Sequence, residues 1–501
     1  MRLKKVISIL LCTVLIFSLG ACSTSTTDAS YECDVVIVGS GPSGMSAAIQ
    51  AADLGADVIV LEKLDVTGGM SFGTEGMFGL GSSMQKEEDL ALPSINEIVK
   101  EELEYTNYKV DPLRWRDFVS ASGENIDWLK SHGVEFEGVT NYMGISSFEC
   151  FHWFVGHTGA TMTGTLANEM ETMGIEVMTG TPATELLIED DKVVGVIASK
   201  TSTDEKIIIK SKSVILATGG FANNTELLSK KTGWDSSRIM SMPNKNVGDG
   251  YNMAIQAGGT DASSCNIPVI SVLGYDALSN IGAVSWQPYL TVNENGERFI
   301  SESLINEKFH ALYSNAHLTQ NKTFLIFDTN TVKTLQSEGP DYGMATVKSG
   351  IALDEVSNQL EEAIESNNGS VYKAETIEDL ATDTGIDTEN LIATIDRYNK
   401  FCDTGKDIDF NNKPNDLYPV KEGPYYALVP SVTILTSIGG FAINRDNQVI
   451  SEKGEPIPGL FSAGVDSNML YDGSYNYQLS GGLMGYNVYS GRNAAQNAIQ
   501  D

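Results

Sequence analysis

The chain has 501 residues, a hydrophobic fraction of 42% and a charged fraction of 20%, values that are ordinary for a globular protein. This length is too great for one hydrophobic core to keep growing, so we expect two domains. The formal net charge of −33 argues against nucleic acid as a partner, because polyanions are bound through Lys and Arg side chains. A strongly acidic, solvated surface is the simpler meaning of this charge.

The first 21 residues have the pattern of an export signal. A basic start, MRLKK, precedes an apolar run from Val6 to Leu19 that is too short to span a membrane comfortably. The run ends in LGAC, which resembles the lipobox of bacterial lipoproteins, where the cysteine is lipidated and becomes the mature N-terminus. Residues 22–30 then form a Ser/Thr-rich tether. We expect a protein held at the extracytoplasmic face of the cell membrane by a lipid on Cys22; a plain secreted protein is the alternative.

The remaining cysteines and the histidines predict no metal site. Cys33, Cys150, Cys265 and Cys402 are far apart, without CxxC spacing, and the five histidines form no HxxxH or HExxH pattern. One disulfide is possible outside the cytoplasm, but its partners do not follow from the sequence. The chain also has no haem-binding CxxCH and no cysteine cluster for iron and sulfur.

The segment after the tether has the pattern of a βαβ unit that binds a dinucleotide. Residues 31–39, YECDVVIVG, are a β-branched run typical of a buried parallel strand. GSGPSG follows at 39–44, then a helix over 45–54 and a strand over 57–61 that ends in Glu62. The glycines let the backbone approach a pyrophosphate at the helix N-terminus, and Glu62 can accept from the ribose hydroxyls. No second GxGxxG follows a strand, which disfavours an enzyme that binds both NAD(P)H and flavin.

The rest of the chain predicts a split domain with an insertion. Residues 185–199 and 205–221 predict antiparallel strands that return to a core strand at 213–217. From about Cys265 to Val429 the pattern becomes mixed, with helical stretches at 353–369 and 388–402. Short strands and glycine turns then return, and a last helix is expected from Leu479.

Further motifs accompany GSGPSG in order along the chain: VIVLEK at 58–63, TGGMS at 67–71, EGM at 75–77, LATGGFA at 216–222, GDG at 248–250, VNENGERFISE at 292–302, EGPYYA at 422–427 and GLFSAG at 459–464. Together they resemble the fumarate reductase-like FAD flavoproteins, which include soluble fumarate reductases, urocanate reductases and, more distantly, 3-ketosteroid dehydrogenases. The resemblance implies an α/β fold. A discontinuous, Rossmann-like FAD-binding domain would comprise residues 31–265 and 430–501, and an inserted α+β capping domain, residues 266–429, would close over the substrate.

The resemblance also implies that FAD is the cofactor and that the flavin N5 exchanges hydride with a carbon of an activated C=C or CH–CH bond. The residues that match the FAD-binding motifs of the family are Gly39, Gly41, Ser43, Gly44, Glu62, Lys63, Gly68, Gly69, Met70, Ser71, Glu75, Gly76, Met77, Ala183, Thr218, Gly219, Asp249, Asp466, Gly481 and Gly482.

The cationic residues of fumarate-type members are replaced at every position that can be aligned. Arginines would clamp the substrate carboxylates and relay the proton, but Asn306 and Gln478 occupy two of these positions, and Leu435-Thr436 replaces a histidine pair. The Arg and Glu of the family's proton relay align near Ser285 and Gly282 of this chain, in a stretch without charge. An uncharged site cannot offset the desolvation of a dicarboxylate, so fumarate is not the expected substrate. The expected substrate contacts, which suit a carbonyl, an amide or an aromatic conjugated acid, are Gln478, Thr436 and Gly481.

Ketosteroid-type members use tyrosines around the substrate carbonyl, and Tyr477 matches such a position. Their catalytic tyrosine falls on Asn306, which has no titratable proton. The candidate catalytic residues are therefore Tyr477, Tyr475 and Asn306, the last through a bound water, with Tyr289 and His310 as further possible proton donors. Packing against the isoalloxazine is the alternative role for Tyr477. His152 and His157 lie in an aromatic segment that we expect to be turn-rich. A structural role is expected for both, and contact with the flavin is the alternative for His157.

The expected function is that of an extracytoplasmic FAD-dependent reductase of an activated C=C bond, an enoate or enone, acting as a terminal reductase in anaerobic respiration. Its partners would be a small unsaturated molecule, the membrane through the lipid anchor, and a membrane-associated electron donor. One alternative is a ketosteroid-type dehydrogenase that passes electrons to a quinone-type acceptor. The other is a flavin-carrying lipoprotein without catalysis.

Overall fold

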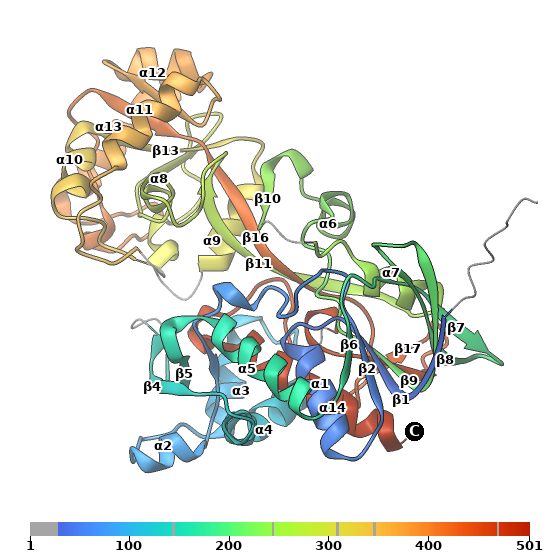
Figure 1. Ribbon diagram of the computed structural model, residues 1–501. Coiled ribbons are helices and arrows are strands. Elements are labelled where there is room, and N and C mark those ends of the chain that lie inside the picture. The colour runs from blue at the N-terminus through green and yellow to red at the C-terminus, as the bar shows by residue number, and fades with distance from the viewer. Residues whose placement is uncertain are drawn as a thin grey trace, which may run out of the picture.

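The computed structural model describes residues 29–142, 146–242, 245–306, 310–343, 347–467 and 470–500. The signal predicted for residues 1–21, the lipidation site Cys22 and most of the 22–30 tether lie outside these described residues. Two lobes are joined by a pair of long strands, β11 (Asp261–Val272) and β16 (Pro430–Phe441), as Figure 1 shows.

The larger lobe is built on an eight-stranded sheet with parallel central strands. It contains strands from both ends of the chain, in the order β17-β18-β9-β1-β2-β6, and β7 and β8 extend β9 as an antiparallel hairpin. The bounds are β1 (Ala29–Val38), β2 (Val58–Leu61), β6 (Glu176–Met178), β7 (Ala183–Glu189), β8 (Lys192–Lys200), β9 (Glu205–Leu216), β17 (Gln448–Ile450) and β18 (Pro456–Ser462).

The central strand β1 is buried on both faces, as its β-branched composition predicts. Val36 of β1 pairs with Ile59 on one side and Val214 on the other, in parallel register. Helices α1 (Pro42–Asp53), α5 (Gly159–Thr172) and α14 (Gly482–Gln500) pack against one face. Helices α6 (Thr225–Thr232) and α7 (Asp249–Gln256) pack against the other. The predicted α/β fold with a parallel sheet is therefore confirmed.

Two elements differ from the sequence-based expectation. The last helix begins at Gly482, not at Leu479, because Gly481 has a φ of +75° that an α-helix does not allow. The segment around His152 was expected to be turn-rich, but Phe151–Phe154 forms β5 of a three-stranded sheet with β3 (Gly76–Phe78) and β4 (Phe136–Thr140). Its four consecutive aromatic side chains, three of them buried, suit a strand that is packed on both sides. The same lobe also contains α2 (Ser83–Glu87), α3 (Ile95–Tyr105) and α4 (Pro112–Ser131).

The smaller lobe, which we call the cap, has a four-stranded sheet surrounded by helices. The strand order is β12-β13-β15-β14, and the pairing is antiparallel. A further three-stranded sheet, β10-β16-β11, connects the cap to the larger lobe. The predicted boundaries at 265/266 and 429/430 stay predictions; they fall within β11 and just before β16. The remaining bounds are β10 (Ile239–Ser241), β12 (Leu290–Asn293), β13 (Thr323–Asp328), β14 (Val371–Ala374), β15 (Tyr425–Leu428), α8 (Asn280–Val284), α9 (His310–Thr319), α10 (Thr329–Ser337), α11 (Val356–Ser366), α12 (Ile377–Thr384) and α13 (Thr388–Thr404).

Candidate active site

The turn between β1 and α1 brings backbone groups to a position where a pyrophosphate can bind. A Cβ on Gly39 would lie 2.2 Å from the carbonyl oxygen of Ala217, and a Cβ on Gly44 would lie 1.9 Å from that of Gly39. These two glycines therefore allow α1 to pack directly on the sheet. A Cβ on Gly41 would meet only Gly69 within 4 Å, so the space beside Gly41 is open. No side chain caps the N-terminus of α1. The N–H groups of the first turn of α1 can therefore bind phosphate oxygens.

Glu62 lies at the end of β2, beside this turn. Its Oε2 accepts hydrogen bonds from the backbone N and the Oγ of Ser40, at 3.0 and 2.7 Å, and its Oε1 accepts from the N of Leu64 at 2.9 Å. These contacts fix the carboxylate, and Oε1, which accepts one of the three, keeps the capacity to accept a further hydrogen bond. The arrangement fits a ribose whose hydroxyls donate to Glu62.

The predicted cofactor residues Lys63 and Asp249 contact each other. The Nζ of Lys63 lies 2.6 Å from Oδ2 of Asp249 and also donates to the carbonyl of Lys245. Ala183 begins β7, two residues after Thr181, whose N donates to the carbonyl of Glu62 at 2.8 Å. Residues from three separate segments therefore meet near the end of β2.

Asp466 joins two of the predicted cofactor segments. Its buried carboxylate accepts hydrogen bonds from the backbone N of Gly220, at 2.8 Å, and from that of Thr218. The Oγ1 of Thr218 in turn accepts from the N of Gly250 at 2.9 Å. Burial raises the pKa of Asp466, against these donated hydrogen bonds. Asp466 therefore holds the glycine turn at 218–220, which includes Gly219, next to the start of α7.

The segments 68–77 and 481–482 meet where the family resemblance places the flavin ring. The N of Gly68 donates to the carbonyl of Ser40 at 3.0 Å, and Ser71 Oγ donates to the carbonyl of Gly68 at 2.9 Å, which ties the 68–71 loop to the phosphate turn. The start of α14 lies against β3, since a Cβ on Gly481 would lie only 2.7 Å from the backbone of Met77. The other predicted cofactor residues of these two segments are Gly69, Met70, Glu75, Gly76 and Gly482, and Ser43 lies in α1, beside Gly464.

The segment 471–479 carries three tyrosines in a row of ring contacts. The ring centroids are 5.2 Å apart for Tyr471 and Tyr475 and 5.0 Å apart for Tyr475 and Tyr477. Burial raises the pKa of Tyr475, opposed by backbone N–H groups at the start of α14. The Tyr475 hydroxyl therefore lies near the backbone N–H groups at the start of α14. The Tyr477 hydroxyl is buried, although the residue as a whole keeps some exposure.

The predicted substrate residues Gln478 and Thr436 make hydrogen bonds within the chain. The Oε1 and the carbonyl oxygen of Gln478 accept from the Oγ and the N of Ser147, at 2.8 and 3.2 Å. Thr436, on β16, donates to the carbonyl of Ser437 at 3.1 Å. Both side chains are neutral hydrogen-bonding groups, as the sequence indicates.

A pair that the sequence did not reveal lies beside the tyrosines. The hydroxyl of Tyr142 donates to Oε2 of Glu75 at 2.5 Å, and its ring packs on Phe151 and Trp153. Burial, followed by the charge of Glu75, raises the pKa of Tyr142, and Tyr477 adds to this effect. Tyr142 stands alone among turn residues in the sequence, so no local pattern singles it out. Glu75, predicted only as a cofactor residue, is also the partner of this phenol.

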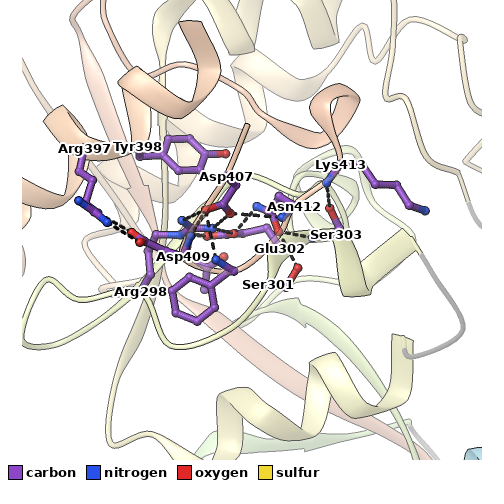
Figure 2. Close-up of polar contacts among 12 residues, drawn as sticks. Arg298, Ser301, Glu302, Ser303, Arg397, Tyr398, Asp407, Asp409, Asn412 and Lys413 are labelled. Carbon is purple, nitrogen blue, oxygen red and sulfur yellow. Dashed lines mark hydrogen bonds and ion pairs between the residues drawn. The ribbon is translucent and has the colours of Figure 1, made fainter. Parts of the chain in front are cut away.

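The motif ERFISE builds a buried ion-pair network in the cap. Arg298 contacts Glu302 at 2.5 Å and Asp407 at 2.8 Å, and Asn412 Nδ2 donates to Glu302 at 2.6 Å; Figure 2 shows these side chains meeting between two loops. Glu302 also accepts from the N of Thr291 at 3.1 Å. The network fixes the 3₁₀ turn Glu302–Asn306.

Asn306 is the last residue of that turn, and its side chain lies outside the described part of the structure, as does that of His310. The Arg298 network therefore sets the backbone position of a predicted catalytic residue. Tyr289, another predicted proton donor, packs inside the cap core against Phe327 and Tyr418.

The two histidines of the β5 region have structural contacts. His152 is fully buried, with Nε2 2.8 Å from Oγ of Ser82, and burial lowers its pKa to about 4. It is therefore neutral at pH 7. His157 is half-exposed and lies 3.0 Å from a carboxylate oxygen of Glu137.

Within the described ranges, no group of His, Cys, Asp and Glu side chains is arranged to hold a metal ion, and Cys33, Cys150, Cys265 and Cys402 are free thiols. No helix in the same ranges is long and apolar enough to cross a bilayer.

Residues 34–482 match the family of FAD binding domains. The match covers most of the chain, and the chain therefore belongs to this family and is an FAD-dependent oxidoreductase. The cofactor and family predictions are confirmed, and the phosphate turn, Glu62 and the 68–71 loop provide a site that fits FAD.

The chain is similar in sequence to reductases and in fold to a dehydrogenase. A vinyl phenol reductase of Lactiplantibacillus plantarum is 34% identical over 93% of this chain and 96% of that protein. A fumarate reductase (cytochrome) of Shewanella frigidimarina is 30% identical over 93% of this chain and 74% of that protein. The solved structure of a 3-ketosteroid-Δ4-(5α)-dehydrogenase of Rhodococcus jostii superimposes with a TM-score of 0.68 over 96% of this chain and 99% of that one, and at 22% identity it shows a common fold.

Proposed function

We propose that this protein reduces a C=C bond conjugated to a neutral polar group, and that a vinyl phenol is the first substrate to test. The observation that carries the proposal is the uncharged, tyrosine-rich segment 473–482, which lies where β3 meets the start of α14. The similarity to a vinyl phenol reductase over nearly its whole length supports it. A vinyl phenol carries no carboxylate, so its binding does not require the arginines that are missing here.

Reduced FAD, when bound, supplies a hydride to one carbon of the double bond, and the chain must supply a proton to the other. Burial raises the pKa of Tyr477, so its phenol keeps its proton at neutral pH. Such a group can donate a hydrogen bond to a substrate oxygen or a proton to a carbon on which negative charge develops. We assign the proton to Tyr477, with Tyr142 and Glu75 as the adjacent pair that can replenish it.

Substrate selectivity tests this function. The purified protein, loaded with FAD and reduced anaerobically by a viologen, should be reoxidised by 4-vinylphenol and by neutral enones. Its kcat/KM for fumarate should be lower by roughly a hundredfold, because the dianion would lose its hydration without gaining a cationic partner. A preference for fumarate would contradict the proposal.

A tyrosine variant tests the proton assignment in the same assay. Tyr477→Phe should slow reoxidation by roughly 10²-fold while the flavin spectrum stays unchanged. The matched control is Tyr108→Phe, because Tyr108 is 69% exposed. If both variants react at the wild-type rate, the proton comes from another group.

We also propose that the protein is a lipid-anchored, extracytoplasmic terminal reductase in anaerobic respiration. The supporting observations are the leader of residues 1–21, the LGAC sequence and the lack of a second dinucleotide motif, which calls for electrons from a membrane-associated donor. Replacement of Cys22 by Ser should move the protein from the membrane fraction to the soluble fraction. Equal membrane retention of the variant would contradict the anchor.

A further inference from the structure

A buried carboxyl group lies beneath the tyrosine segment. Glu102, on α3, is 0% exposed, and its Oε2 accepts a hydrogen bond from Nδ2 of Asn476 at 3.2 Å. Its Oε1 has no hydrogen-bond partner among the described residues. The motifs of the sequence do not include Glu102, and nothing in the proposed chemistry has used it.

The surroundings of Glu102 contain no positive charge among the described residues. The groups that face it come from its own helix, from β11 and from the tyrosine segment: Glu101, Tyr105, Cys265, Tyr471, Tyr475 and Asn476. A buried carboxylate without a cation is costly. Burial accordingly raises the pKa of Glu102 to about 8, with the amide of Asn476 opposing the shift. The carboxyl therefore holds its proton at neutral pH.

Glu102 and Tyr105 hold the residues that precede Tyr477. The Oδ1 of Asn476 accepts from the N of Gln478 at 3.0 Å and caps the 3₁₀ turn Tyr477–Leu479. The Tyr105 hydroxyl donates to the carbonyl of Tyr475 at 2.8 Å. Helix α3 thus fixes positions 475 and 476, on the N-terminal side of the proposed proton donor.

We propose that Glu102, as a neutral carboxylic acid, is a positioning residue that fixes the substrate-facing turn 475–479 through Asn476, and that its ionisation loosens this turn. The inference rests on the proposed function, because that function makes 475–479 the substrate-facing turn. Ionisation would place an uncompensated charge among apolar and phenolic side chains. Such a charge favours a rearrangement that admits water to the carboxylate. The turn 475–479 would move with the carboxylate, because Asn476 donates to it and also caps this turn.

The variant Glu102→Gln tests this role, because glutamine has a similar shape and cannot ionise. With 4-vinylphenol as the probe, the wild-type KM should rise about tenfold between pH 7 and pH 9, since the competent fraction falls by that factor around a pKa of about 8. The variant should match the wild type at pH 7 and change less than about twofold at pH 9. The control is Glu104→Gln, on the exposed face of α3, which should keep the wild-type profile.

Two results in this assay would overturn the proposal. One is an unchanged alkaline rise of KM in Glu102→Gln, and the other is an equal loss of activity at every pH, which would indicate a packing role. A second readout does not depend on turnover: the infrared carbonyl band of a protonated carboxylic acid should be present in the FAD-loaded wild type at pH 7 and absent in Glu102→Gln. A missing band in the wild type would refute the neutral Glu102. If the wild type reduces no substrate but shows the band, the proposed function fails and the protonation of Glu102 stands.

Discussion

Gly44→Ala should release FAD from this protein. The added methyl group would lie 1.9 Å from the carbonyl oxygen of Gly39, a distance at which the backbone of one of the two residues must move. Because Gly44 lies in the first turn of α1, the helix would shift away from β1, and its N–H groups would leave the pyrophosphate position. We expect FAD binding to weaken by roughly a hundredfold or more, which titration of the apoprotein with FAD would measure.

The matched control for this experiment is Gly164→Ala. Gly164 lies in α5, a helix of the same lobe, and a Cβ there meets no atom within 4 Å. This change should keep FAD binding and slightly stabilise the helix. Wild-type FAD affinity in Gly44→Ala would show that α1 tolerates the displacement and would contradict the packing described for the phosphate turn.

Arg298→Met should unfold or loosen the cap while leaving FAD bound. The change would leave the carboxylates of Glu302 and Asp407, both 0% exposed in their side chains, without their cation. Breaking a buried ion pair in this way typically costs about 3–5 kcal/mol. Because FAD binds in the larger lobe, we expect normal flavin content, faster proteolysis of the cap and little turnover.

The pH dependence of this variant has a defined sign. In the wild type, burial acts to raise the pKa of Asp407. The hydrogen bond and the charge of Arg298, with smaller help from backbone N–H groups, outweigh burial and hold this pKa below its ordinary value. The stability from this pair is present above the unfolded pKa of Asp407 and is lost as the pH falls through the folded one. In Arg298→Met the pKa of Asp407 in the folded state should rise. The destabilisation of the variant relative to the wild type should therefore be smaller at pH 5 than at pH 7.

The control for the cap is Arg397→Met, which removes a neighbouring arginine whose partner is Asp409. Its side chain is 57% exposed, and we expect no measurable change in cap proteolysis. Equal sensitivity of the two variants to protease would show that the Arg298 network does not hold the cap.

The sequence predicted those parts of the molecule that depend on neighbours along the chain. The βαβ unit, the hairpin β7–β8 and helices α11 and α13 follow from periodicity and glycine placement within short windows. The start of α14 was misplaced by three residues, because the φ of Gly481 depends on how it packs against Met77.

The polar partners in and around the site could not be predicted, because they join residues that are distant in sequence. Tyr142 meets Glu75, Glu102 meets Asn476, and Arg298 meets Asp407, at separations of 67, 374 and 109 residues. No short sequence motif marks these pairs, because the two residues of each pair are brought together only by the fold. Motifs therefore predicted the family and the cofactor, whereas these long-range polar contacts emerged from the structure.

The most direct test of the central claim is a single turnover. The FAD-loaded protein, reduced by a viologen without oxygen, is mixed with 4-vinylphenol while the flavin absorbance and the product are followed. Our account predicts that the oxidised flavin spectrum returns and that one ethylphenol forms per FAD, because one hydride and one proton pass to one double bond. A flavin that stays reduced in the presence of 4-vinylphenol, enones and enoates alike would contradict it and would favour a protein that carries flavin without reducing such bonds.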